Sequence, residues 1–277
     1  MNDSEPGSPS TPDDTYTHGH HASVLKSHSW RTVENSAAYL TPHLKPGRSL
    51  LDVGCGPGTV TREFAERLAP GPVLGIDVSS DIVAQARAAV DPAVHGNLEF
   101  RVEDCYRMGV DDHSFDIVHA HQVLQHLSDP VAALREMKRV VSPAGLVAVR
   151  DADYHGMFWA PASEGLDRWM EVYQGVARRN RAEPDAGRHL VAWARQAGFG
   201  SITASASTWC FATPAEREWW GGLWAERITR SALAHQAVAY GVADHEELEQ
   251  LAAAWRSWTD HPDGWFAVVN SELLLRP

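Results

Sequence analysis

A glycine-rich turn follows the first short apolar segment of this chain. The run Asp52-Val53-Gly54-Cys55-Gly56-Pro57-Gly58 stands between that segment and a stretch of helical periodicity. Glycines let the backbone turn sharply and approach a ligand, and the N-terminus of a helix offers free N–H donors. Asp77, 23 residues beyond Gly54, ends the next apolar segment, where its carboxylate can accept hydrogen bonds from both ribose hydroxyls. The pattern predicts a site for a nucleoside-containing cofactor.

The spacing of the glycines indicates which cofactor this would be. A dinucleotide site has the pattern G-x-G-x-x-G, whereas the third glycine here is Gly58 and Thr59 follows it. A second acid, Asp104, ends the third apolar segment and could meet an adenine amino group. S-adenosylmethionine contains no pyrophosphate, whereas a nicotinamide cofactor needs both the helix terminus and more room. The spacing therefore favours S-adenosylmethionine.

These residues need a scaffold in which several short strands end at one edge. Between 49 and 153, short apolar runs bounded by Gly, Asp or Pro alternate with stretches of helical periodicity. Such alternation is typical of a parallel sheet covered by helices on both faces. We expect strands at Leu50–Val53, Val73–Ile76, Leu98–Val102, Phe115–His119 and Leu146–Val149, with helices at Thr59–Leu68, Asp81–Val90 and Pro130–Val141.

The remaining segments complete one α/β domain over 48–277. Ser201–Phe211 and Trp265–Leu275 are expected to form a final strand pair, so the predicted fold is a doubly wound, mainly parallel seven-stranded sheet. Residues 1–14 are polar and Pro-rich, which predicts a disordered tail. Residues 15–47 show helical periodicity and precede the first strand, so we expect them to lie over the cofactor as a helical lid.

Large aromatic side chains are concentrated in the second half of the chain. Ten of the eleven tryptophans occur from Trp159 onward, many in helical stripes. We expect acceptor-side helical segments at about 154–187 and 213–260. These stripes indicate core packing, and the same tryptophans would also suit the lining of an apolar substrate cavity.

Composition and charge exclude several partners. With 36 acidic and 24 basic residues the formal net charge is −12, which disfavours nucleic acid and anionic membrane surfaces. No apolar run approaches the roughly 20 residues of a membrane helix, and the N-terminus lacks the basic, apolar leader of a secreted protein. Cys55, Cys105 and Cys210 form neither a disulfide framework nor a zinc motif. We expect a cytoplasmic protein with a small-molecule partner.

The motifs from 48 to 153 resemble those of class I S-adenosylmethionine-dependent methyltransferases. The resemblance rests on Asp52–Gly58, Asp77, Asp104 and Phe115–Val118. Leu124–Leu127 and Pro143-x-Gly145 are similar to the quinone-biosynthesis type that acts on small molecules. The resemblance implies that Gly54, Cys55 and Gly56 contact the methionine part and that Asp77 and Val78 lie at the ribose. It also implies adenine contacts from Asp104 and Cys105, and it places His121 and Gln122 beside the sulfonium.

The predicted lid is rich in side chains that chemistry uses. Tyr16 could close the pocket, and Arg31 could meet the methionine carboxylate or form a surface ion pair with Glu34 or Glu63. His20 and His21 are candidate bases because an imidazole titrates near neutrality, although a helix cap or a surface position is the alternative for either. Metal binding by His18, His20 and His21 lacks a clear fourth ligand, so we expect no metal.

Further candidates flank the acceptor. Methyl transfer requires positioning and, for a protonated acceptor, removal of one proton, so no single base is indispensable. His121 follows the fourth strand and is the third candidate base, while Asp153 after the fifth strand is another candidate. The residues expected to contact the acceptor are Trp30, Asn35, His126, Asp153, Tyr154 and Trp159.

The lid also resembles a second group of enzymes. Tyr16–His21 and Arg31–Leu40 are similar to fungal and actinobacterial enzymes that S-methylate dithiol natural products of the gliotoxin and dithiolopyrrolone types. This resemblance implies a thiol acceptor, which is partly ionised near neutral pH and strongly nucleophilic. The alternative is O- or C-methylation of a phenolic or quinone-like molecule. Two hypotheses from other functional classes are a nicotinamide oxidoreductase and a non-catalytic binding protein.

Overall fold

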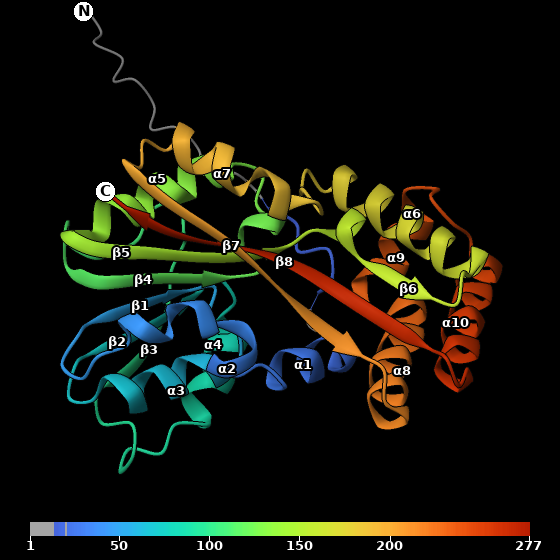
Figure 1. Ribbon diagram of the computed structural model, residues 1–277, viewed down its shortest axis with the longest axis horizontal. Helices are drawn as coiled ribbons and strands as arrows, with labels where there is room; N and C mark the ends of the chain where they lie inside the picture. The colour runs from blue at the N-terminus through green and yellow to red at the C-terminus, as the bar shows by residue number, and fades with distance from the viewer. Residues whose placement is uncertain (1–13, 20) are drawn as a thin grey trace, which may run out of the picture.

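Parallel strands run through the protein, and helices cover both of their faces (Figure 1). The computed structural model describes residues 14–19 and 21–277. Within these residues eight strands form one sheet in the order β3-β2-β1-β4-β5-β8-β6, and β7 pairs with β8. The strands are β1 (Leu50–Val53), β2 (Val73–Asp77), β3 (Leu98–Val102), β4 (Phe115–His121), β5 (Val141–Ala152), β6 (Phe158–Ala160), β7 (Ser201–Phe211) and β8 (Trp265–Arg276).

The helices lie in three groups around this sheet (Figure 1). The N-terminal group is α1 (Ala22–Ser29), α2 (Val33–Ser36) and the 3₁₀ helix η1 (Ala38–His43). The helices on the two sheet faces are α3 (Thr59–Leu68), α4 (Ser80–Ala88), α5 (Pro130–Val140) and α7 (Ala186–Gln196). The third group is α6 (Glu164–Arg179), α8 (Pro214–Arg230), α9 (Ala232–Ala239) and α10 (His245–Asp260), and the 3₁₀ turns η2 (Leu124–His126) and η3 (Tyr154–Gly156) complete the set.

The predicted α/β fold with a mainly parallel sheet is confirmed. Strands β1 to β5 pair in parallel, and β8 runs antiparallel to β5, β6 and β7. The seven predicted strands are all present, and β6 is an additional strand that the sequence analysis missed. It exists because β8 extends beyond its pairing with β5, so that Phe158–Ala160 can pair with Trp265–Ala267.

Apolar faces explain how the sheet and its helices pack. Leu50, Leu51 and Val53 of β1 are fully buried, as expected for a central strand covered on both sides. On α3, Val60, Phe64 and Leu68 recur at helical spacing and pack against one face of the sheet. The other face is covered by α5 and α7. Burial on both faces fixes where the strands end, and therefore where their polar end residues lie.

The third group of helices holds an aromatic core. Trp169 of α6 lies edge-on to Trp224 of α8 and Trp255 of α10, with ring centroids 4.6 and 4.9 Å apart. Trp169 and Trp255 are fully buried and lie outside the cavity described below, as expected for core tryptophans. The packing of these rings fixes α8 as one wall of the space beyond the sheet.

The N-terminal segment is held in place by side-chain hydrogen bonds. Asp14, which we had assigned to the tail, accepts from the Tyr106 hydroxyl at 2.6 Å and from the Ser128 N–H at 2.8 Å. The rest of the predicted tail, 1–13, lies outside the described residues. Thr32 and Asn35 form a capping box that begins α2. In Figure 1, α1 lies between the sheet and α8.

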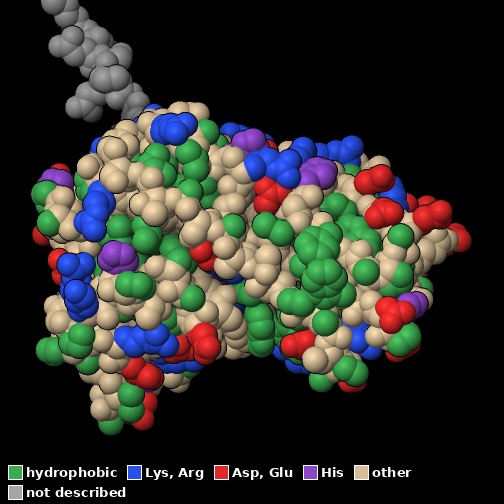
Figure 2. Space-filling model, in the orientation of Figure 1, with side chains coloured by type: hydrophobic (Ala, Val, Ile, Leu, Met, Phe, Trp, Pro, Cys, Tyr) green, Lys and Arg blue, Asp and Glu red, His purple; other side chains and the backbone are tan. Residues whose placement is uncertain are grey.

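One exposed hydrophobic group lies away from this segment. Figure 2 shows hydrophobic side chains gathered over β6 and β8 on the face in view. Phe158 and Trp265 are both exposed, and their ring centroids lie 4.9 Å apart. Elsewhere on the same face, basic and acidic side chains are mixed.

Candidate active site

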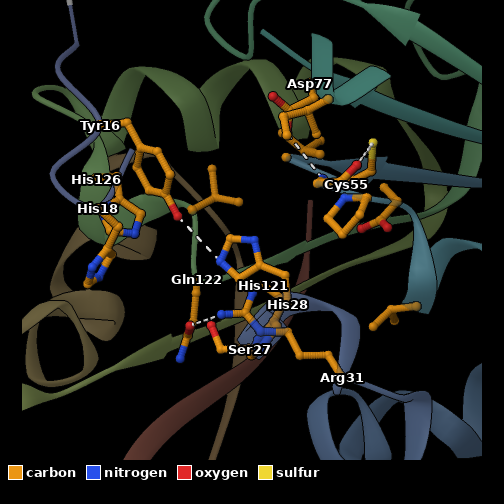
Figure 3. Close-up of a pocket in the computed structure, with 18 of the residues that line it drawn as sticks. Tyr16, His18, Ser27, His28, Arg31, Cys55, Asp77, His121, Gln122 and His126 are labelled. Atoms are coloured by element: carbon orange, nitrogen blue, oxygen red, sulfur yellow. Dashed lines mark hydrogen bonds between the residues drawn. The ribbon is translucent and has the colours of Figure 1, made fainter. Parts of the chain in front are cut away.

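A cavity of about 430 Å³ lies where the parallel strands end (Figure 3). Its floor comes from the β1–α3 turn and from the ends of β2, β3 and β4. Its walls come from the N-terminal segment, from β7 and from α8. The carboxyl edge of a parallel sheet is the usual ligand site in this type of fold. The cavity is continuous from Asp104 at one end to Arg227 at the other.

The glycine turn has the backbone geometry that its sequence predicts. Gly54, Gly56 and Gly58 all have positive φ values, at 67°, 54° and 75°. A Cβ atom at Gly54 would lie 2.4 Å from Cγ2 of Val123, so only glycine fits there without a shift. The turn therefore keeps its backbone close to the cavity.

The carboxylate of Asp77 is positioned by backbone donors. Its Oδ2 accepts from the Gly56 N–H at 3.1 Å, and its Oδ1 accepts from the Ser79 N–H at 3.0 Å. The following residue, Val78, is 77% exposed although it is apolar, and it lines the cavity. Asp104 also lines this end, where its Oδ1 accepts from the Tyr106 N–H at 2.9 Å. A fixed strand-end carboxylate beside a bare apolar face fits the ribose and adenine of S-adenosylmethionine.

Arg31 and Gln122 meet in the middle of the cavity. The Arg31 guanidinium donates to Oε1 of Gln122 (Figure 3), and Gln122 Nε2 donates to Oδ1 of Asn270 at 3.2 Å. Burial lowers the pKa of Arg31 to about 10. Its Nε has no hydrogen-bond partner among the described residues. Among the described residues Arg31 forms no ion pair with Glu34 or Glu63. Glu63 accepts from the Val33 N–H and pairs with Arg67.

His121 is a buried histidine in the cavity wall. Neither ring nitrogen has a hydrogen-bond partner among the described residues, and the ring lies edge-on to Trp209 at 5.7 Å. Burial, with Arg31 and Arg150 nearby, lowers its pKa well below the ordinary value of 6.5. The imidazole is therefore neutral at neutral pH, so one ring nitrogen has a free lone pair and the other carries an N–H.

Aromatic and imidazole side chains line the end of the cavity beyond His121. Tyr16 lies edge-on to His126 at 4.8 Å, and its hydroxyl lies 3.4 Å from Nε2 of His28 (Figure 3). Burial and the Arg31 charge lower the pKa of His126 to about 3. Tyr154, expected at the acceptor, also lines the cavity. These rings present flat surfaces that carry no charge at neutral pH.

His18 lies at the same end and was considered only as a possible metal ligand. Its Nε2 lies 3.0 Å from the Tyr173 hydroxyl and 3.3 Å from the Tyr154 hydroxyl. Burial and then Arg227 lower its pKa well below 6.5. The run of histidines in the sequence was a signal of function, but which of them faces the cavity depends on how α1 packs.

The structure places several predicted residues at the cavity and others away from it. Of the predicted cofactor and acceptor residues, those that line it are Tyr16, Trp30, Arg31, Gly54, Cys55, Gly56, Asp77, Val78, Asp104, Cys105, His121, Gln122, His126 and Tyr154. His20 lies outside the described residues. His21, Asn35, Asp153 and Trp159 do not line the cavity.

Each of these four residues has a structural role instead. His21 is the N-cap of α1, where its Nδ1 accepts from the Ser23 N–H at 3.3 Å, which is the helix-cap alternative of the sequence analysis. Both oxygens of Asp153 accept from the Arg188 guanidinium, at 2.6 and 2.7 Å, which removes it from the acceptor. Asn35 is bound in the capping box of α2, and Trp159 stacks on Phe266 at 5.6 Å.

Sequence reasoning missed Arg227 and Glu103, two charged residues that line the cavity. Arg227 of α8 is 4% exposed, and its guanidinium lies over the Trp224 ring at 4.5 Å. Trp209, Trp220 and Trp224 line the same wall, which agrees with the expectation that some of the tryptophans surround a cavity. No sequence motif marks Arg227, because its place depends on tertiary packing.

No helix in the described ranges is long and apolar enough to cross a membrane. Among the same residues, no three His, Cys, Asp or Glu side chains are grouped so that they could hold a metal ion.

Comparison with known proteins shows the family. Residues 51–149 match the model of a methyltransferase domain. Over 270 residues the chain is 34% identical to an uncharacterized methyltransferase of Schizosaccharomyces pombe, covering 94% of this chain and 96% of that protein. It is 29% identical over 276 residues to a probable methyltransferase of Aspergillus luteorubrus, with the same coverage of both chains. The chain belongs to the class I S-adenosylmethionine-dependent methyltransferases.

A solved structure supports the same fold. Phosphoethanolamine N-methyltransferase 2 of Haemonchus contortus, in complex with S-adenosyl-L-methionine, superimposes with a TM-score of 0.55 at 19% identity. The match covers 87% of this chain and 52% of that longer one. This similarity shows the fold, while the family membership makes the protein a methyltransferase whose cofactor is S-adenosylmethionine. Its acceptor is a separate question.

Proposed function

We propose that this enzyme methylates an oxygen or carbon atom of a flat, largely apolar molecule of the phenolic or quinone-like class. The observation that carries the proposal is His121, a neutral imidazole with two unpartnered nitrogens in the cavity wall. A phenol has a pKa near 10, so its methylation at neutral pH gains from a base that removes the proton.

The proposed cofactor contacts lie on two sides of the glycine turn, with the ribose and adenine on one side and the methionine part on the other. Asp77 would accept the ribose hydroxyls, and Val78 and Cys105 would enclose the adenine, whose amino group Asp104 would meet. On the other side Gly54, Gly56, Arg31 and Gln122 would hold the methionine part. When bound, S-adenosylmethionine supplies a methyl group on a positively charged sulfur, which is already an activated leaving group. The chain therefore needs to provide position rather than activation.

His121 would remove the proton from the acceptor. It lies at the end of β4 next to Gln122, and so between the cofactor side and the aromatic end of the cavity. As the acceptor atom takes up the methyl group, its proton would pass to the imidazole and leave through solvent after product release. Arg31 and Arg150 disfavour a charged imidazole, so the proton would not remain on His121.

The walls favour a flat acceptor. Trp209, Trp220 and Trp224 present aromatic faces and edges, and Tyr154 also lines the cavity. Stacked and edge-on contacts with a ring would supply affinity without many polar contacts. Trp30, which packs on Trp209 at 5.3 Å, would extend this surface toward α1.

S-methylation of a thiol was the expectation drawn from the resemblance of 16–40. The lid residues that line the cavity, such as Tyr16 and Arg31, would enclose any acceptor, and neither relative described above is named for a thiol substrate. A thiolate also forms readily near neutral pH and needs less help from a base. A thiol acceptor is therefore one outcome of the test.

The test has a binding arm and a turnover arm. Calorimetry with S-adenosylhomocysteine should give saturable binding, whereas NAD should give none. Transfer of a labelled methyl group into phenols, hydroquinones and dithiols should then label a phenol or hydroquinone, and NMR of the product would identify the methylated atom. Labelling of dithiols alone would overturn the proposed acceptor, and binding without transfer to any acceptor would favour a non-catalytic role.

A further inference from the structure

Arg227 is a buried cation without an acidic partner. Its Nη2 donates to the Ser23 carbonyl oxygen at 3.1 Å and to Ser27 Oγ at 3.0 Å. Its guanidinium also lies over Trp224. Among the described residues no carboxylate forms an ion pair with Arg227. The groups that oppose the lowering of its pKa by burial are the phenols of Tyr154, Tyr16 and Tyr173. The positive charge of Arg227 is therefore in contact with two neutral oxygen acceptors and one aromatic ring.

Other buried arginines of the chain are compensated in different ways. Arg150 lies 3.3 Å from the carboxylate of Glu272, and both side chains are buried. Arg217 lies outside the cavity and donates to the carbonyl oxygens of Thr259 and Ala212. Arg31 also lines the cavity, and in the proposed function it binds the methionine part of the cofactor. A buried charge without a counter-charge is costly to the fold, so its retention in a cavity wall indicates a ligand that supplies the opposite charge.

Further donors of the cavity-lining residues on α8 are unpartnered. Arg227 Nε, Trp220 Nε1 and Trp224 Nε1 are buried and have no hydrogen-bond partner among the described residues. All three residues line the cavity. Donors without acceptors cost free energy in a buried site unless a ligand brings oxygen atoms. The acceptor end of the cavity is therefore rich in donors, positively charged and aromatic.

We propose that the methyl acceptor carries an anionic oxygen group, of which an aromatic carboxylate is the simplest form, and that Arg227 binds this group. The inference rests on the proposed function and narrows its substrate class. A planar guanidinium matches a carboxylate geometrically, and it can keep its contact with the Trp224 ring at the same time. Arg227 is thus a specificity residue of the acceptor site, and Arg31 stays with the carboxylate of the cofactor.

The experiment uses the full chain saturated with S-adenosylhomocysteine, so that the cofactor's own carboxylate is already in place. Matched pairs of ligands are titrated by calorimetry: benzoate and benzamide, 4-hydroxybenzoate and 4-hydroxybenzamide, 2-naphthoate and 2-naphthamide. We expect at least one carboxylate to bind ten times or more tightly than its amide. The preference should weaken with added salt.

Variants of α8 assign the preference to one side chain. R227Q should remove the preference for the carboxylate, and R227K should retain part of it. R230Q is the matched control, because it removes the same charge from an exposed position on the same helix. Since Arg227 also bonds α1, each variant is first checked for unchanged affinity for S-adenosylhomocysteine.

The wild-type protein gives a readout that does not require an Arg227 variant. The indole N–H resonance of Trp224, assigned with W224F, should shift on addition of a carboxylate and not of its amide. Equal binding of carboxylate and amide in all pairs, or an unchanged preference in R227Q, would overturn the inference and leave the proposed function intact. Failure to bind S-adenosylhomocysteine would instead overturn the proposed function itself.

Discussion

Nδ1 of His119 lies 2.7 Å from Oδ1 of Asp52, and the two residues are register partners on β4 and β1. The other oxygen of Asp52 accepts from the Thr61 hydroxyl of α3 at 2.6 Å. All three side chains are buried. The carboxylate thus joins two strands and a helix directly before the glycine turn, and it holds the turn at the cavity floor.

Replacing this carboxylate should destabilise the fold. D52N keeps the size of the side chain but removes the charge and places an amide N–H₂ against one of two donors. We expect the free energy of unfolding to fall by about 1–3 kcal/mol, measured by urea denaturation. D111N, at an exposed aspartate, is the control. Equal urea midpoints for D52N and the wild type would show that the network does not stabilise the protein.

The Asp77 carboxylate should contribute directly to cofactor affinity. D77A should weaken binding of S-adenosylhomocysteine by roughly 1–3 kcal/mol, because the ribose hydroxyls lose their acceptors. Calorimetry gives the dissociation constant. D81A, at an exposed aspartate in the first turn of α4, should bind like the wild type. An unchanged dissociation constant in D77A would refute the placement of the ribose.

The two glycines before Pro57 should differ in their tolerance of alanine. At Gly54 a Cβ atom would collide with Val123, whereas at Gly56 the nearest atom is His28 Nδ1 at 3.8 Å. Both positions carry the strain of a positive φ, so the contrast isolates the collision. We expect G54A to lose more thermal stability and more cofactor affinity than G56A. Equal losses in the two variants would mean that the positive φ alone, and not the collision with Val123, causes them.

Removal of the imidazole at 121 should affect turnover more than binding. H121N should lower kcat at least tenfold with little change in affinity for S-adenosylhomocysteine. Because the pKa of His121 lies well below 6.5, kcat/KM of the wild type should not decline on its account until the pH is well below that value. H21N is the control, since asparagine also caps a helix. Equal turnover by H121N and the wild type would exclude the base.

Buried neutral histidines should make stability depend on pH. The pKa of His126 falls from 6.5 to about 3 on folding, so the unfolded chain binds more protons between these values. Stability is therefore complete above pH 6.5 and is lost as the pH falls toward 3, by up to about 1.4 kcal/mol per pH unit for each such histidine. Urea denaturation at pH 7.5 and 5.5 should show this loss, and H126N should reduce it. A slope unchanged in H126N would contradict the assignment.

Local patterns account for the parts of the fold that the sequence predicted well. Strands β1, β3 and β7 and helix α3 have the predicted bounds, because their apolar runs are bounded by residues that end an element. Helix α7 was not predicted. Its buried positions include Ala186, Gly187 and Ala194, which are small and give little contrast with the exposed face. Strand β6 is three residues long and depends on the overhang of β8.

The residues of the site likewise fall into a part that the sequence predicts and a part that depends on tertiary packing. The glycine turn and Asp77 lie next to strand ends, so their positions follow from the chain order. Arg227 and Ser23 are 204 positions apart, and their contact arises only when α8 packs on α1. A similar dependence explains why His21 proved to be a cap and His18 a wall residue. Sequence patterns name residue types that suit a site, and tertiary packing selects among them.

The hydrogen bonds between α1 and Arg227 have a consequence for how molecules enter and leave. Residues 16–31 border the donor half of the chamber through Arg31 and the acceptor half through Tyr16 and His18, and Ser23 and Ser27 tie the same stretch to α8. If this stretch swings outward, both halves open together. Release of the spent donor and of the methylated product would then require the same movement.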